Sequence, residues 1–180
     1  MQPMGYEYDL INDFAKSQGL KLNIKVAENP ARLIEMLEAG EADVVAYPIP
    51  INNKLKQEVI YCGREDISSQ VLIQRANKGD KLLTDVTQLI DKNVYVKPNT
   101  KYSERLKNLD EELGGGIHIQ KVENDSIATE DLIEMVSLGE IPYTISDDNT
   151  ARLNKTYYWN INVDLKVSFP QRSSWGVRKS

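Results

Sequence analysis

The chain has 180 residues, of which 41% are hydrophobic and 27% are charged, as is ordinary for a globular protein of one domain or two small lobes. Its net charge of −5 and the lack of a basic cluster argue against nucleic-acid binding, which needs Lys and Arg to neutralise phosphates. A single cysteine, Cys62, and a single histidine, His118, exclude an internal disulfide and a Cys/His zinc cluster. No apolar run approaches the ~20 residues of a membrane-spanning helix.

The first third of the chain twice repeats a helix that ends at glycine and is followed by a β-rich run. Asp9–Gln18 has a helical apolar face, Gly19 suits the left-handed position after it, and Leu20–Val26 alternates like a strand. The next helix opens at Asn29-Pro30, because proline is favoured at the first helical position. A short buried strand is expected at Asp43–Ala46.

The same unit recurs twice in the second half. Tyr102 to Leu113 has apolar residues at helical spacing and precedes a strand at Ile117–Val122. Thr129 to Leu138 has acidic residues in its first turn, where the helix dipole favours them, and precedes a strand at Tyr143–Ser146. Between the two pairs lies Ser68–Arg75, whose alternation predicts a connecting strand with one solvent-facing side.

Alternation of helices and strands with short connections predicts an α/β fold with mainly parallel sheets covered by helices on both faces. We expect two lobes, the second inserted into the first. Lobe 1 takes residues 1–68 and 166–180, and lobe 2 takes residues 69–165.

Three motifs resemble those of type 2 periplasmic solute-binding proteins of the amino-acid-binding class. They are Gly5–Leu10 (GYEYDL), Gly40–Ala46 (GEADVVA) and Gly139–Asp147 (GEIPYTISD). Within that superfamily, the sequence YTISD and the segment Ser168–Lys179 are most similar to the solute-binding-like domain of membrane-bound lytic transglycosylase F proteins. The resemblance implies a two-lobed fold that closes on a small ligand about paired hinge strands, for which Ser68–Gln70 and Leu165–Ser168 are the candidates.

The resemblance implies a partly retained amino-acid site. Asp147 matches the aspartate that binds the ligand ammonium, and Thr100, which follows Asn99 in a loop before a helix, matches a carboxylate-contacting threonine. Leu55 stands where the family has the arginine that binds the ligand carboxylate. Lys54 or Lys56 would replace that arginine only as a point charge, without its planar fork.

Each candidate also has a plainer structural role. Asp147 could cap the helix that begins after it. The tyrosines Tyr6, Tyr8 and Tyr47 could stack on a ligand or simply pack. For the remaining residues we expect packing or solvent exposure rather than chemistry: Trp159 and Trp175 in the core or between lobes, Cys62 packed at a strand end, and His118 structural or exposed.

The sequence therefore predicts a non-catalytic, cofactor-free and metal-free binding module of a cell-envelope protein, periplasmic or associated with the outer membrane. It would be the regulatory part of a membrane-bound lytic transglycosylase whose catalytic domain lies further along the full-length protein, and its ligand would be peptide-like or cell-wall-derived. The alternatives are a solute receptor of an amino-acid-type ABC transporter and, more remotely, a cyclohexadienyl dehydratase-like enzyme.

Against the family pattern, the first strand and the last helix of lobe 1 are absent from the sequence. Loss of an internal strand leaves unpaired backbone groups and an open apolar slot. We expect one of three outcomes: a neighbouring chain that fills the slot as a homodimer or by strand exchange, a rearranged lobe 1, or a chain cut from a longer protein.

Overall fold

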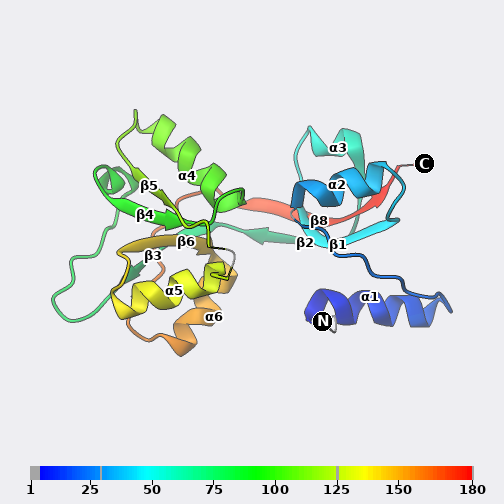
Figure 1. The fold of residues 1–180 in the computed structure, drawn as a ribbon, viewed down its shortest axis with the longest axis horizontal. Coiled ribbons are helices and arrows are strands. Elements are labelled where there is room, and N and C mark those ends of the chain that lie inside the picture. Colours follow the sequence, from blue (N-terminus) through cyan, green and yellow to red (C-terminus); the bar gives the residue numbers. More distant parts are fainter. Residues whose placement is uncertain (1–4, 29, 125, 180) are drawn as a thin grey trace. The chain divides into compact units, whose positions relative to one another are not determined.

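The computed structural model describes residues 5–28, 30–124 and 126–179 (Figure 1). The chain divides into two compact units. One unit takes the chain up to Ile67 and again from Gln171, and the other takes Ser68–Pro170. None of the described helices is both long and apolar enough to cross a membrane.

The unit Ser68–Pro170 is built on a five-stranded sheet with the strand order β5-β4-β6-β3-β7. Strand β4 runs parallel to β5 and to the central strand β6, whereas β3 runs antiparallel to β6 and to β7. The strands are β3 (Gln70–Arg75), β4 (Asn93–Val96), β5 (His118–Lys121), β6 (Tyr143–Asp147) and β7 (Ile161–Asn162). The sheet is thus mixed rather than mainly parallel, because β3 is not reached through a crossover helix, the connection that makes neighbouring strands parallel.

Helices cover both faces of this sheet, as predicted. In Figure 1, α4 (Lys101–Glu112) lies on one side of the strands, and α5 (Thr129–Leu138) and α6 (Asp148–Tyr157) lie on the other. A short 3-10 helix, η1 (Val86–Leu89), precedes β4. Helix α5 has the predicted bounds, and α4 begins one residue before the predicted start.

The two helical layers correct one expectation about β3. Leu72 packs into the core cluster that contains Leu106 of α4, whereas Val71 and Ile73 pack into the cluster that contains α5 residues such as Ile133. All residues of β3 except the last are buried. The predicted solvent-facing side of this strand is therefore wrong, because a strand between two helical layers has no free face.

The other unit contains a three-stranded sheet with the order β1-β8-β2. Its strands are β1 (Val44–Pro50), β2 (Val59–Ser68) and β8 (Gln171–Arg178), and β1 runs antiparallel to β8. Its helices are α1 (Tyr6–Ser17), α2 (Pro30–Glu38) and α3 (Leu55–Glu58). Its core cluster of buried residues is small and consists of Leu37, Val45, Ile49 and Val59.

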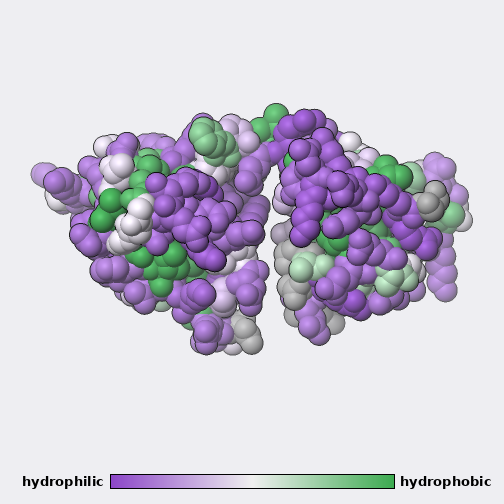
Figure 2. Space-filling model, turned by 90° about the horizontal axis from the view of Figure 1, so that it is seen from above, coloured by the Kyte–Doolittle hydropathy of each residue, from purple (hydrophilic) through white to green (hydrophobic). Residues whose placement is uncertain are grey.

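The strand predicted at Leu20–Val26 does not form. Strand β1 pairs with β8 on one side and, among the described residues, with no strand on the other. A groove of about 460 Å³ lies there, lined by residues of α1, of the segment after it and of β1. Phe14, on the apolar face of α1, keeps 53% of its surface exposed. Hydrophobic patches also interrupt the mostly hydrophilic surface in Figure 2.

Candidate functional site

The parallel pairing of β4 and β6 brings two predicted site residues to the same edge of the sheet. Val94 of β4 is in register with Tyr143 of β6, and the carboxyl ends of parallel strands meet at one edge. The loop after β4 leads to Asn99, Thr100 and the start of α4, while β6 ends at Asp147. Helix α4 therefore begins beside the end of β6.

Thr100 is the N-cap residue of α4, and its hydroxyl is occupied by local contacts. Its Oγ1 accepts a hydrogen bond from the backbone N–H of Ser103 at 3.2 Å and donates one to the carbonyl oxygen of Lys97 at 2.8 Å. The Ser103 hydroxyl completes the capping box by accepting from the N–H of Thr100. The preceding Asn99 has a φ of 56°, a left-handed conformation that asparagine tolerates better than most residues.

The Asp147 carboxylate contacts α4 rather than capping α6. Its Oδ2 accepts hydrogen bonds from Lys101 Nζ at 2.5 Å and from the Tyr102 hydroxyl at 3.0 Å. Asp147 holds the N-cap position of α6, but its side chain makes no capping hydrogen bond. The Lys101 ammonium also lies 5.4 Å from the centroid of the Tyr102 ring, within the range of a cation–π contact. Of the two roles considered for Asp147, the structure excludes the helix cap.

A buried polar side chain lies next to this carboxylate. Gln70 is directly opposite Asp147 in the antiparallel β3–β6 pair, so their side chains emerge on the same face of the sheet. Gln70 is only 2% exposed, and no donor among the described residues reaches its Oε1. A buried acceptor without a donor is costly, so such atoms often mark a site for water or a ligand.

The two candidate hinge segments lie side by side. The backbone N–H of Gln70 donates to Ser168 Oγ at 2.8 Å, and the N–H of Val167 donates to the carbonyl oxygen of Gln70 at 2.9 Å. One of these segments leads directly to the β3 end of the Asp147 site.

The candidates in the other unit are less concentrated. Tyr47 lies on β1 and lines the groove together with Tyr8 of α1. Tyr6 is largely exposed at the start of α1. Lys54 is the N-cap residue of the short helix α3, just before Leu55. Tyr6, Tyr47 and Lys54 thus come from separate elements of this unit.

Sequence reasoning missed Lys101 and Tyr102 as partners of Asp147. In the sequence Tyr102 belongs to the apolar face of α4, and no residue near Lys101 along the chain identifies its partner. One signal was present: a lysine at the first helical position is unusual, because the helix dipole disfavours a cation there. The acidic partner that compensates it lies 46 residues along the chain.

Four single residues of the sequence analysis remain: two tryptophans, His118 and Cys62. Trp159 is 80% exposed, so it does not belong to the core of its unit. Trp175 is partly buried, and its indole N–H donates to Glu7 Oε2 at 2.9 Å. His118 is exposed. Cys62 is partly buried, and this burial raises the pKa of its thiol. The described part of the chain contains no group of three or more His, Cys, Asp or Glu residues that could hold a metal ion.

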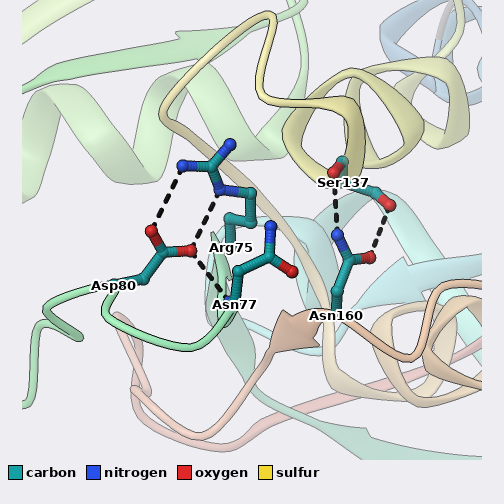
Figure 3. Close-up of polar contacts among 5 residues, drawn as sticks. All are labelled: Arg75, Asn77, Asp80, Ser137 and Asn160. Carbon is teal, nitrogen blue, oxygen red and sulfur yellow. Dashed lines mark hydrogen bonds and ion pairs between the residues drawn. The ribbon is translucent and has the colours of Figure 1, made fainter.

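A second polar cluster lies where β3 ends and β6 begins (Figure 3). Arg75 donates two hydrogen bonds to the Asp80 carboxylate, at 3.0 and 3.2 Å, and the backbone N–H of Asn77 donates a third at 2.8 Å. These contacts, led by that with Arg75, lower the pKa of Asp80. Nearby, the side chains of Ser137 and Asn160 are hydrogen-bonded to each other at 2.6 Å. The Arg75 and Asn77 contacts with Asp80 hold the loop after β3, and the Ser137–Asn160 hydrogen bond connects the end of α5 with the segment before β7.

Known proteins similar to this chain fall into two groups. The family model of bacterial extracellular solute-binding proteins, family 3, matches residues 1–156. A membrane-bound lytic murein transglycosylase F of Desulfosudis oleivorans is 32% identical over 98% of this chain and 38% of its own length. A protein of the same name from Pseudomonas fluorescens is 27% identical, over 96% of this chain and 35% of its own length. The chain thus spans little more than a third of these curated relatives.

The similar solved structures are amino-acid-binding proteins. An ancestral arginine-binding protein bound to arginine has a TM-score of 0.74 and 20% sequence identity, with 98% of this chain and 75% of that chain covered. An ancestral arginine-binding protein bound to glutamine has a TM-score of 0.71 and 20% identity, with 98% and 74% covered. At such identities the likeness concerns the fold.

Proposed function

Since the chain belongs to family 3 of the bacterial extracellular solute-binding proteins, we propose that it is a non-catalytic module that binds a small peptide-like or cell-wall-derived molecule. The observation that carries the proposal is the Asp147 site. A carboxylate with only 20% of its side chain exposed lies at the carboxyl edge of a sheet beside the start of α4, a place where α/β proteins commonly bind ligands.

The loss of the arginine argues against a simple amino-acid receptor. Leu55 stands where the family resemblance places a guanidinium, and a leucine cannot make the paired hydrogen bonds with which arginine binds a carboxylate. The neighbouring Lys54 offers a charge without that geometry. A ligand whose carboxylate is absent, or placed differently from that of a free amino acid, fits this pattern better.

We assign the ligand contacts to both units. The contact residues in this proposal are Asp147, Thr100, Asn99, Tyr6, Tyr47 and Lys54. The proposed lobes are residues 1–68 with 166–180 and residues 69–165, and they would close on the ligand about Ser68–Gln70 and Leu165–Ser168. The hydrogen bonds between those two segments support a coupled hinge.

Calorimetry with muropeptides and free amino acids tests the proposal. Wild-type protein should bind a muropeptide, and Asp147→Ala should weaken binding by about tenfold or more, since a charge-assisted hydrogen bond contributes roughly 1.5–3 kcal/mol. Glu134→Ala is the matched control, because Glu134 is exposed on α5 and should not affect binding. Tight binding of free amino acids with no response to Asp147→Ala would contradict the proposal.

The names of the curated relatives support a proposal about the role in the cell. We place the module in the cell envelope, as the regulatory part of a lytic transglycosylase whose catalytic domain lies elsewhere in the full-length protein, because the curated relatives carry that name. The ABC-transporter receptor is the alternative, and a permease gene beside this gene would favour it. Turnover of prephenate or arogenate would instead favour the remote dehydratase alternative.

One side of β1 pairs with no strand among the described residues, and this supports a proposal about a protein partner. We propose that a second copy of the chain exchanges a strand into the groove between α1 and β1, forming a homodimer. Two features support this. Among the described residues β1 has a strand on one side only, and the unpaired backbone of an edge strand is a template for another strand. Half-exposed apolar side chains such as Phe14 and Ile24 line the groove beside it. An added strand would pair with the free edge of β1 and would cover these apolar side chains.

A further inference from the structure

We infer that Lys101 acts as a built-in cation for Asp147 and thereby sets the class of ligand. The site would select a molecule whose amino group is blocked as an amide over one with a free α-ammonium. This inference rests on the proposed function, and it concerns which molecules the same site accepts.

The geometry places Lys101 where a ligand ammonium would otherwise pair with the carboxylate. Lys101 Nζ and the Tyr102 hydroxyl both bind Asp147 Oδ2, at 2.5 and 3.0 Å. The lysine side chain is 41% exposed, so it can reach the carboxylate from solvent without itself being buried. The negative charge of Asp147 is therefore already compensated by the protein.

The start of α4 strengthens the discrimination. Lys101 is the first residue of a helix of 12 residues, and the positive end of the helix dipole points at the same place. A free ammonium would meet the positive end of this dipole and the like charge of Lys101, so it would gain less from the Asp147 carboxylate than it would without them. An amide N–H carries no net charge, so it can donate a hydrogen bond without displacing Lys101.

The buried side chain of Gln70 is suited to accept a hydrogen bond from an uncharged N–H group of the ligand. Its Oε1 lacks a donor among the described residues, and it belongs to the residue directly opposite Asp147. Gln70 and Asp147 together offer more acceptor positions than Lys101 and Tyr102 fill. A neutral N–H can satisfy such an acceptor without bringing a second charge into a largely buried place.

The test compares L-alanyl-D-glutamate with its N-acetyl form by calorimetry. Wild-type protein should bind the acetylated dipeptide at least about tenfold more tightly. Lys101→Met keeps the length and apolar stem of the side chain but removes the charge, so the free dipeptide should gain about tenfold and the preference should disappear. Lys107→Met is the control: Lys107 is exposed on the same helix and pairs with Glu111, so the preference should stay.

The outcomes separate the two levels of the hypothesis. If wild-type protein prefers the free dipeptide, or if Lys101→Met leaves the preference unchanged, the inference about Lys101 is overturned while the binding function stands. If neither dipeptide binds to wild-type protein or to Lys101→Met, and circular dichroism shows both folded, the proposed function is wrong and the inference falls with it.

Discussion

At the scale of single residues, the role of Asp147 depended on contacts that are distant along the chain. Its position before a helix allowed a capping role, which is a local property that a sequence can suggest. Its partners Lys101 and Tyr102 lie 46 and 45 residues away, and only the parallel pairing of β4 and β6 brings them close. The residue itself was predictable from the family motif, whereas its ion pair was not.

The pair of Arg75 and Asp80 gives a residue-scale prediction about pH. The hydrogen bonds that Arg75 donates to the Asp80 carboxylate lower the pKa of Asp80 below the ordinary value of 3.8. A depressed carboxyl pKa stabilises the fold above the unfolded-state value, and this contribution disappears as the pH falls through the folded-state value. Asp80→Asn should therefore lower the free energy of unfolding at neutral pH and have little effect in strong acid, as measured by urea unfolding.

The double variant provides the control for this effect. Arg75→Gln removes the same ion pair from the other side, so its loss at neutral pH should resemble that of Asp80→Asn. Combining the two should add little, because residues that share one interaction are not additive. A destabilisation by Asp80→Asn that persists undiminished in acid would contradict the assigned cause.

At the scale of elements, helices were predicted better than strands. Helix α5 has the predicted bounds because its hydrogen bonds and its acidic first turn are local. The run Leu20–Val26 has the alternation of a strand but does not form a strand. A strand needs a neighbouring strand to pair with its backbone hydrogen-bonding groups. The prediction of an exposed face for β3 was wrong because exposure depends on which helices pack over the strand, and this is also decided by distant parts of the chain.

The proposed strand exchange makes a prediction about the groove beside β1. Wild-type chain should be a dimer by light scattering, and Phe14→Ser should shift it toward monomer. Because Phe14 is half exposed within the chain, this change should cost little unfolding free energy, about 0.5 kcal/mol or less, as is usual for surface substitutions. Leu37→Ser, at a fully buried position of α2, should instead destabilise the fold strongly. A wild-type monomer at all concentrations would refute the exchange.

At the scale of the whole molecule, the two compact units are unequally supported by core residues. The unit Ser68–Pro170 contains two clusters of buried hydrophobic residues, one under α4 and one under α5 and α6. Among its described residues, the other unit has one small cluster around Leu37, and apolar side chains of its helix α1 are half exposed. Burial of apolar surface is the main favourable term in folding, so the units should differ in stability.

We therefore expect separate unfolding of the two units in urea. Fluorescence of Trp175, which is partly buried in β8, should report the weaker unit, and amide hydrogen exchange of β3 and β6 should report the stronger one. Leu37→Ala should lower the first transition alone and Leu106→Ala the second, each by about 2–5 kcal/mol. Transitions that coincide for both probes and both variants would show one cooperative molecule instead.

The sequence by itself determined the α/β class, most helices with their glycine ends, and the family motifs that led to Asp147 and Thr100. These features are local, because helical periodicity, capping and left-handed glycines act within a few residues. The tertiary structure decided which strands pair and in which direction, that Leu20–Val26 pairs with no strand among the described residues, and that Lys101 forms an ion pair with Asp147. Those outcomes depend on contacts between segments far apart in the chain, where neither periodicity nor composition specifies which groups meet.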